Sequence, residues 1–347
     1  MNNKEPILIT GANGEVGHGL IPKLSELGNY DIVSLDIREL DEELKPHIHE
    51  TIVADILDST VVKNLLKEHA ITTIFHLAAI LSTGGEKDPF RAHQVNVNGT
   101  TSLLESSYQV ALSEKRTIKF IFPSTIAVYG IPDLETKKKV GTVKEDGFNA
   151  PITMYGINKL YCERVGTYYS KFYKILETRP EVLPIDFRCV RFPGIISAMT
   201  VPSGGTSDYA PEMIHSAARG EGYESFVRSD TVIPFMVMPD AVKALLTLTN
   251  APKEKLTQGI YNVSGFSATA EQIAGLVNQV FPDSSISYNP DQNRQKIVDS
   301  WPAAVDDSAA KRDWGWKPDY DILKAFNEYL IPEIQDRYKN NQINPTG

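Results

Sequence analysis

A tyrosine and a lysine four residues apart are the side chains of this sequence best suited to acid–base chemistry. Tyr155 and Lys159 open a segment of helical character that extends to about Tyr173, and this spacing places both on one face of a helix. An unperturbed tyrosine titrates near ~10, so a phenolate at neutral pH needs a pKa about 2–3 units lower, which a nearby ammonium favours. The pair predicts a base that takes the proton of an alcohol, although a core tyrosine beside a solvated lysine is the simpler interpretation of the spacing alone.

Two hydroxyl side chains follow an apolar segment that is typical of a buried strand, 118–123. Ser124 and Thr125 come directly after this segment. Ligands of open α/β sheets bind beyond the carboxyl ends of the strands. A hydroxyl at that edge can donate a hydrogen bond to a reacting oxygen.

A glycine-rich turn joins the first predicted strand, 6–10, to a helix and reads Gly11-Ala12-Asn13-Gly14-Glu15-Val16-Gly17. Gly11 permits the tight turn, Gly14 lets backbone N–H groups approach a pyrophosphate, and Gly17 lets the helix pack closely on the strand. The phosphates would then lie at a helix N-terminus, where unpaired N–H groups and the helix dipole favour an anion. The turn predicts a dinucleotide-binding fold.

An acidic residue, Asp36, ends the second predicted strand, 32–36. It lies close to the ~20-residue separation at which an acid hydrogen-bonds the adenosine ribose. Its charge repels a 2′-phosphate, which favours NAD over NADP, whereas Arg38 supports NADP and a strand-end cap is the plainer role for Asp36. Together with the tyrosine, lysine and hydroxyls, these residues predict hydride transfer from an alcohol to NAD.

The alternation of strands and helices indicates what must position these groups. Segments rich in Ile, Val, Phe and Leu recur at 6–10, 32–36, 51–54, 73–78, 118–123 and 185–192. This alternation predicts an α/β fold of Rossmann type, a doubly wound parallel sheet with helices on both faces. The residues expected around one crevice at the strand ends are Gly11, Asp36, Asp55, Ala78, Ser124 and those after Phe192.

A smaller, interleaved lobe is predicted after Pro193, where the pattern becomes irregular. The length of 347 residues suggests about two lobes, and a strand at 259–263 is able to rejoin the sheet. We therefore expect a NAD-binding domain of residues 1–192 plus about 232–265. A substrate-binding lobe of about 193–231 plus 266–347 completes the chain.

Composition and charge argue against several classes of protein. The net charge is −9 and the basic residues are dispersed, which argues against nucleic-acid binding. The single basic run, Lys137-Lys138-Lys139, is interpreted as a solvated loop. The N-terminal sequence lacks the pattern of a signal peptide, and no apolar stretch is long enough to span a membrane.

Cysteines and histidines add little chemistry. Cys162 and Cys189 cannot build a disulfide framework, so a reducing, cytoplasmic setting is expected. The segment His47-Ile48-His49-Glu50 lies between two predicted strands with no further ligand near it in sequence. A surface turn is the better interpretation, and no metal is expected.

The chain resembles the extended short-chain dehydrogenases/reductases over nearly its whole length. The segments similar to that family are Phe75–Ala79, Asn96–Thr100, Tyr155–Lys159 and Trp314–Pro318. Within it, the chain is similar to the short-chain-type L-threonine 3-dehydrogenases at Pro123–Ala127, Gly204–Ala210, Pro234–Ala241 and Asp299–Pro302. The resemblance implies oxidation of the L-threonine 3-hydroxyl by NAD to 2-amino-3-ketobutyrate, a step of threonine catabolism.

The resemblance also implies roles for particular residues. Tyr155 would take the hydroxyl proton, Lys159 would hold the nicotinamide ribose, and Thr125 would bond the substrate oxygen. The residues expected to bind the cofactor are Gly11, Asn13, Gly14, Glu15, Val16, Asp36, Ile37, Arg38, Asp55, Ile56, Leu77, Ala78, Ala79, Asn96, Ser124, Tyr155, Lys159 and Ile195. Those expected to contact the substrate are Ser82, Thr125, Tyr155, Gly194, Thr206 and Trp301.

In this substrate set, the hydroxyls of Ser82 and Thr206 would face the carboxylate and the Gly194 carbonyl region the ammonium. Trp301 would exclude water from the hydride path.

Three features depart from the family's pattern. Leu134–Val143 is an extra lysine-rich loop, and Tyr173–Pro184 is an extra stretch after the helix that carries Tyr155. Ser203 stands where a glycine is expected, which puts the backbone geometry near Thr206 in question.

Two other functions compete with the dehydrogenase. A sugar-nucleotide epimerase or dehydratase would keep NAD bound and would need arginines to pair a diphosphate; Arg219, Arg228 and Arg294 are the candidates. A non-catalytic NAD-binding regulator is the second alternative, and the intact Thr125, Tyr155 and Lys159 argue against it.

The family likeness further suggests a homodimer through helices at 93–112 and 155–176. The apolar residues available for that interface are Leu103, Leu104, Leu160 and Val165, which could equally face the sheet.

Overall fold

The structure is a computed structural model that describes residues 4–202 and 204–343. Ser203, the position where a glycine was expected, lies outside the described residues. The chain divides into two compact units. The first comprises the chain up to Val128 together with Thr153–Arg191 and Val242–Tyr261, and the second comprises Tyr129–Ile152, Phe192–Ala241 and the chain from Asn262 onward.

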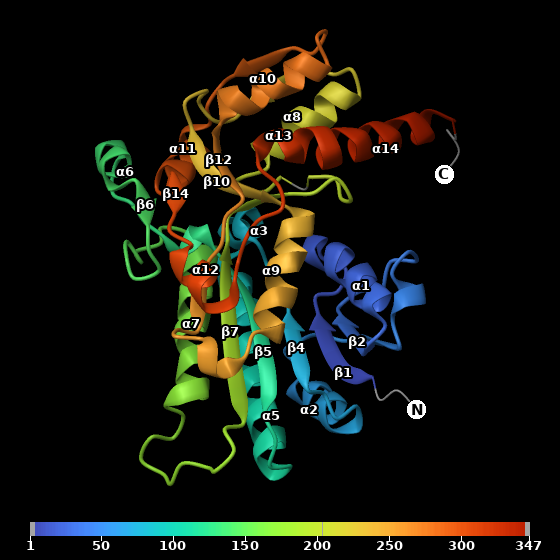
Figure 1. Cartoon of the computed structure of the whole chain (residues 1–347), viewed down its shortest axis with the longest axis vertical. Helices are drawn as coiled ribbons and strands as arrows, with labels where there is room; N and C mark the ends of the chain where they lie inside the picture. The colour runs from blue at the N-terminus through green and yellow to red at the C-terminus, as the bar shows by residue number, and fades with distance from the viewer. Residues whose placement is uncertain (1–3, 203, 344–347) are drawn as a thin grey trace. The chain divides into compact units, whose positions relative to one another are not determined.

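A seven-stranded sheet forms the centre of the first unit, and Figure 1 shows β1, β2, β4, β5 and β7 side by side. The order is β11-β7-β5-β4-β1-β2-β3. The strands are β1 (Glu5–Thr10), β2 (Tyr30–Asp36), β3 (Glu50–Val53), β4 (Thr73–His76), β5 (Ile118–Thr125), β7 (Ile185–Phe192) and β11 (Ile260–Asn262). The pairs β1–β2, β1–β4, β2–β3 and β4–β5 are parallel. The predicted α/β fold with a parallel sheet is confirmed.

Several helices accompany this sheet in the first unit. They are α1 (Glu15–Leu27), α2 (Ser59–Glu68), α3 (Ser82–Lys87), α4 (Pro89–His93), the π-helix η2 (Gln94–Gly99), α5 (Thr100–Ser113) and α7 (Met154–Lys171). Helix α7 begins at Met154 because the hydroxyl of Thr153 accepts a hydrogen bond from the backbone N–H of Gly156 at 3.1 Å. The core includes Phe120 and Phe122 of β5 with Leu103 and Leu104 of α5.

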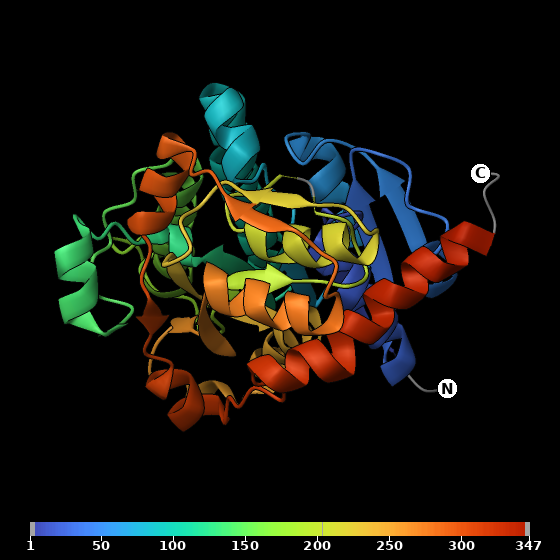
Figure 2. The same ribbon diagram turned by 90° about the horizontal axis from the view of Figure 1, so that it is seen from above.

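The second unit contains short sheets and its own helices. Its strands are β6 (Thr142–Val143), β8 (Gly194–Ile196), β9 (Tyr223–Ser225), β10 (Val232–Val237), β12 (Phe266–Thr269), β13 (Ile286–Tyr288) and β14 (Ala304–Val305). Strands β12, β10 and β8 form one sheet, β13 pairs with β9, and β14 pairs with β6. Figure 2 shows α8 (Tyr209–Ala218), α10 (Ala270–Val280) and α14 (Ile331–Ile343) side by side.

The other α-helices of the described residues are α6 (Leu134–Val140), α9 (Met238–Asn250), α11 (Gln292–Asp299), α12 (Ser308–Trp314) and the short α13 (Ile322–Lys324). Helix α9 starts in the second unit and continues into the first.

The interpretation of Lys137–Lys139 as a solvated loop is wrong for one of the three lysines. The run lies in helix α6, whose N-cap residue Asp133 accepts a hydrogen bond from the backbone N–H of Thr136 at 2.7 Å. Lys138 and Lys139 are exposed, whereas Lys137 is buried and its ammonium donates to the carbonyl of Val298 at 3.1 Å. The run is therefore a capped helix with one buried lysine.

Cys162 and Cys189 are free and buried. Within the described ranges, no group of His, Cys, Asp and Glu side chains is arranged to hold a metal ion. None of the helices described is long and apolar enough to cross a membrane.

Candidate functional site

The turn after β1 has no room for side chains at its first and last glycines. Gly11 has a φ of 67°, and a Cβ there would lie 2.5 Å from the backbone nitrogen of Ala78. A Cβ at Gly17 would lie 2.0 Å from the carbonyl oxygen of Ala12. Gly14 is the N-cap residue of α1 and has no side chain to bond the first-turn N–H groups. The turn therefore fits a pyrophosphate at the start of α1.

Asp36 lies against this turn at the end of β2. Its carboxylate accepts hydrogen bonds from the backbone N–H of Asn13 at 3.0 Å and of Arg38 at 3.2 Å. An ionised carboxylate has about four acceptor sites, so it retains acceptors for the hydroxyls of a ribose. The side chain of Asn13 donates to the carbonyl of Glu39 and accepts from the N–H of Asp41, which fixes the turn to the segment after Asp36.

One cavity of about 300 Å³ collects most of the residues predicted to bind the cofactor. The predicted residues that line it are Gly11, Asn13, Gly14, Asp36, Ile37, Arg38, Asp55, Ile56, Leu77, Ala78 and Ala79. The lining residues that sequence reasoning missed are Leu35, Ala54, Ile80, Arg91 and Val95. The predicted residues outside this lining are Glu15, Val16, Asn96, Ser124, Tyr155, Lys159 and Ile195.

Arg91 and Asn96 show how the cavity wall is held. Arg91 of α4 forms an ion pair with Asp55 at 2.9 Å. A hydrogen bond from the N–H of Leu57, and then Arg91, lower the pKa of Asp55. Asn96 is buried, and its amide exchanges two hydrogen bonds with the backbone of Ile80 at 2.7 and 2.9 Å. Asn96 therefore fixes the loop that lines the cavity. The sequence could have indicated Arg91 only through the need of Asp55 for a charged partner.

Tyr155 and Lys159 lie together in the first turns of α7. The buried ammonium of Lys159 donates to the carbonyl of Pro123 at 2.8 Å and lies 5.8 Å from the centroid of the Tyr155 ring. Burial lowers the pKa of Lys159 to about 8 and raises the pKa of Tyr155 well above its usual range. The lower tyrosine pKa that the sequence suggested is therefore absent in the chain alone, because desolvation of the phenol is the dominant influence.

The two hydroxyls at the end of β5 are bonded differently. Ser124 is buried and donates its hydrogen to the carboxylate of Glu163 at 2.6 Å. The oxygen of Thr125 accepts from the backbone N–H of Ala127 at 3.1 Å. No acceptor for the Thr125 hydrogen lies among residues 4–202 and 204–343. Thr125 can therefore donate to a reacting oxygen, whereas Ser124 has already committed its hydrogen.

A buried ion pair behind these hydroxyls was missed by sequence reasoning. Glu163, four residues after Lys159 on α7, is paired with Arg191 of β7 at 2.6 Å, and both side chains are fully buried. Arg191 also donates its Nε to the carboxylate oxygen that accepts from Ser124. An arginine inside an apolar strand was the signal in the sequence, since buried charges require partners.

Ser82 is the other predicted substrate residue of the first unit. It is the first residue of α3 and is buried. Helix α3 lies against the start of α7, because the carboxylate of Glu86 accepts from the N–H of Met154 at 2.8 Å and a Cβ at Gly85 would lie 3.7 Å from the Tyr155 nitrogen.

The remaining predicted substrate residues, and Ile195, belong to the second unit. Gly194 and Ile195 lie in β8, opposite Phe235 and Met236 of β10. Thr206 is buried in the turn before α8. Trp301 follows α11, has 5% of its surface exposed, and donates its backbone N–H to the carbonyl of Val298 at 3.2 Å.

The arginines that a diphosphate would need are engaged within the second unit. Arg228 makes two hydrogen bonds to Asp299, at 2.9 and 3.0 Å. Arg219 is paired with Glu221 at 2.7 Å. Arg294 donates to the carbonyl of Gly204 at 3.0 Å and lies 4.1 Å from the centroid of the Phe226 ring. All three arginines therefore already have partners within the second unit.

Comparisons with known proteins agree with this geometry. Residues 7–264 match the model of the NAD dependent epimerase/dehydratase family. The mitochondrial L-threonine 3-dehydrogenase of Bos taurus is 34% identical, and the match covers 94% of this chain and 82% of that protein. An uncharacterized epimerase/dehydratase of Staphylococcus haemolyticus is also 34% identical, with 97% and 99% covered. Among solved structures, a monomeric L-threonine 3-dehydrogenase from a metagenome has a TM-score of 0.82 at 35% identity, with 95% of this chain and 99% of that chain covered.

Proposed function

The chain belongs to the NAD-dependent epimerase/dehydratase family, and from this premise we propose that it is an L-threonine 3-dehydrogenase. It would oxidise the 3-hydroxyl of L-threonine with NAD, giving 2-amino-3-ketobutyrate in threonine catabolism. The observation that carries the proposal is the arrangement at the end of β5, where Thr125 keeps a hydrogen to donate while Ser124 does not. The threonine dehydrogenases among the similar proteins support the choice of substrate.

We assign the proton transfer to Tyr155. Its phenolate would take the hydroxyl proton of the substrate while Thr125 donates a hydrogen bond to the same oxygen. Lys159, held by the Pro123 carbonyl, would bind the nicotinamide ribose and add positive charge near the phenol. Bound NAD would supply the acceptor for the hydride from Cβ of threonine and a positive ring that favours the phenolate. Because burial raises the pKa of Tyr155, both positive charges would act against that effect.

The cofactor would be held by the first unit. The Gly11–Gly17 turn fits the pyrophosphate and Asp36 fits the adenosine ribose, which favours NAD over NADP. The second unit would supply the substrate contacts Gly194, Thr206 and Trp301. In the first unit, Ser82 would add a hydroxyl for the threonine carboxylate. The predicted division into a NAD-binding domain and a substrate lobe is thus part of the proposal.

A homodimer is proposed through α7. Four large side chains on this helix and its C-cap, spaced four or seven residues apart, are between 44% and 50% exposed: Ile157, Tyr161, Tyr168 and Phe172. Leu103 and Leu104, which the sequence offered for the interface, are fully buried in the core, so they cannot form it.

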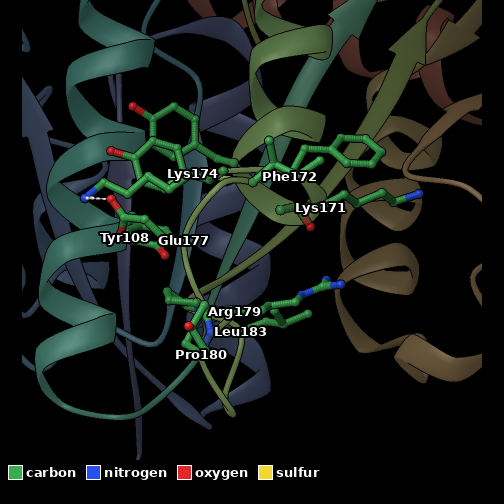
Figure 3. Close-up of a pocket in the computed structure, with 14 residues that line it drawn as sticks. Tyr108, Lys171, Phe172, Lys174, Glu177, Arg179, Pro180 and Leu183 are labelled. Carbon is green, nitrogen blue, oxygen red and sulfur yellow. Dashed lines mark ion pairs between the residues drawn. The ribbon is translucent and has the colours of Figure 1, made fainter.

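The end of this helix is ordered by its tyrosines. Tyr169 and Tyr173 both donate to the carboxylate of Glu105, at 2.8 and 2.5 Å. In the pocket that lies after this helix, Lys174 is paired with Glu177 (Figure 3).

One similar protein is described as monomeric, so sedimentation tests the proposed dimer. A stable monomer at micromolar concentration contradicts it.

We also propose a cytoplasmic location, since both cysteines are free and buried rather than paired.

The test is NADH formation with a panel of L-threonine, L-allo-threonine, D-threonine, L-serine and UDP-galactose. L-Threonine alone should give steady NADH formation, and Tyr155→Phe should abolish it while NAD binding remains. Tyr161→Phe is the matched control on the same helix, because this tyrosine is half exposed. UDP-galactose consumed without net NADH would support the epimerase instead, and NAD binding without turnover would support the regulator.

A further inference from the structure

The extra segment before β6 is attached to the turn that carries Trp301. Within the second unit, the N–H of Ile131 donates to the carbonyl of Ser300 at 2.8 Å. After α6, β6 pairs in parallel with β14, with Thr142 opposite Ala304. The segment therefore contacts the chain on both sides of Trp301.

Lys137 supplies a third attachment at the C-terminus of α11. Its ammonium donates to the carbonyl of Val298, and the backbone N–H of Trp301 donates to that same oxygen at 3.2 Å. A cation is favourable at a helix C-terminus, where carbonyls lack partners within the helix. One carbonyl thus joins Lys137 directly to the turn of Trp301.

Side chains do not fill all of the space between the α6 segment and α11. A cavity of about 620 Å³ is lined by Ile131 and Leu134 on one side and by Gln295 and Ser300 on the other. Because side chains do not fill the space between the two segments there, polar contacts such as that of Lys137 help to hold them together.

The lysine is retained at an electrostatic cost. It is buried, and Asp299, a carboxylate that acts on it electrostatically, is already bonded twice by Arg228. Burial lowers the pKa of Lys137 to about 8, with Asp299 and Asp230 opposing the effect and Arg228 adding to it. Among the residues that the structure describes, the ammonium bonds a carbonyl and no carboxylate, which indicates a positional role.

We propose that α6 is a brace that fixes Trp301, and that Lys137 is the positioning residue through which it acts. The role of the brace toward L-threonine rests on the proposed function, in which Trp301 contacts the substrate. The brace itself does not depend on that function.

The position of Trp301 can be followed without any substrate. The chain has three tryptophans, so protein labelled with 5-fluorotryptophan gives three fluorine resonances, which Trp→Phe variants assign. Lys137→Met keeps the apolar stem and removes the donor, and we expect it to shift or broaden the Trp301 resonance alone. Lys138→Met, one residue away and exposed, should leave all three unchanged. An unshifted Trp301 resonance in Lys137→Met overturns the brace.

Kinetics test the link to the substrate. In Lys137→Met the KM for L-threonine should rise about five-fold or more, with kcat and the Kd for NAD within about two-fold, as expected for lost substrate positioning. A moved Trp301 resonance with an unchanged KM overturns the role toward threonine. No turnover of L-threonine by the unsubstituted protein contradicts the proposed function, and the fluorine spectra still decide the brace.

A second variant keeps the proposal testable if Lys137→Met does not fold. Asp133→Ala removes the exposed N-cap of α6 and leaves Lys137 in place, so it weakens the brace without a buried change. It should shift the Trp301 resonance in the same direction by a smaller amount. If Lys137→Met does not fold, an unshifted Trp301 resonance in Asp133→Ala overturns the brace.

Discussion

The ends of β1 and β5 are parts of the same sheet, but different forces fix the residues that follow them. After β1, the backbone is confined by neighbouring backbone, and a single added carbon at Gly11 or Gly17 collides. At the end of β5, Ser124 is held by a hydrogen bond to the buried Glu163–Arg191 pair of α7 and β7, and Thr125 by the N–H of Ala127. The first region excludes added atoms, whereas the second depends on charges that must not be lost.

Removing Glu163 tests the second kind of region most severely. Glu163→Leu leaves the buried guanidinium of Arg191 without its carboxylate, and breaking a buried pair in this way costs about 3–5 kcal/mol. Urea unfolding should show this loss. Glu135→Leu, which removes an exposed partner of Lys139, should be nearly neutral by comparison. A stable Glu163→Leu protein would show that packing, not charge, orders the end of β5.

The two neighbouring hydroxyls should separate activity from stability. Thr125→Val should lower kcat for L-threonine by about 10²-fold, the cost of one lost donor to a reacting oxygen, with little change in the free energy of unfolding. Ser124→Ala should lower that free energy by about 1–3 kcal/mol, because its bond to buried Glu163 is lost. Both kcat and urea unfolding are measured for the two variants. A destabilised Thr125→Val and a stable but inactive Ser124→Ala would contradict the account.

An added methyl tests the first kind of region. Gly17→Ala places a Cβ 2.0 Å from the Ala12 oxygen, so α1 must move, at a cost of about 1–3 kcal/mol. NAD binding, measured by calorimetry, should weaken at the same time. Gly275→Ala, on α10, is the control, because a Cβ there meets nothing within 4 Å. Equal NAD affinity in both variants would refute the steric account of the turn.

The smallest expected effect concerns pH and Lys137. Burial lowers the pKa of Lys137 to about 8, whereas the unfolded chain titrates near ~10.4. Between these values the folded protein binds fewer protons, so the free energy of unfolding should rise with pH relative to that of Lys137→Met. Urea unfolding of both proteins from pH 7 to 10 measures the difference, and parallel curves would contradict it.

The same contrast explains what the sequence predicts and what it leaves out. The strands and the glycine turn follow from local spacing, because apolar runs and adjacent glycines define them. Glu163 and Lys137 bond to Arg191 and Val298, which lie 28 and 161 residues further along. Lys137 sits in a run of three lysines that is typical of a solvated surface, and only a carbonyl from a distant helix end accounts for its burial.

The candidate site also has a part that local sequence spacing predicts and a part that depends on contacts between distant residues. Most of the predicted cofactor residues lie in one cavity because each follows the end of a strand in the sheet. The commitment of the Ser124 hydrogen to Glu163 was not predictable, since it depends on the side-chain orientation of a residue on another element. The roles of Gly194, Thr206 and Trp301 in the second unit remain proposals.

The most direct test of the central claim is to follow the hydrogen on Cβ of threonine. With L-[3-²H]threonine and NAD, deuterium should appear stoichiometrically in released NADH, and the rate of NADH formation should fall relative to unlabelled substrate. Tyr155→Phe should show neither transfer nor release. Deuterium that stays on the amino acid while NAD remains oxidised would contradict the assignment of the chain as a threonine dehydrogenase.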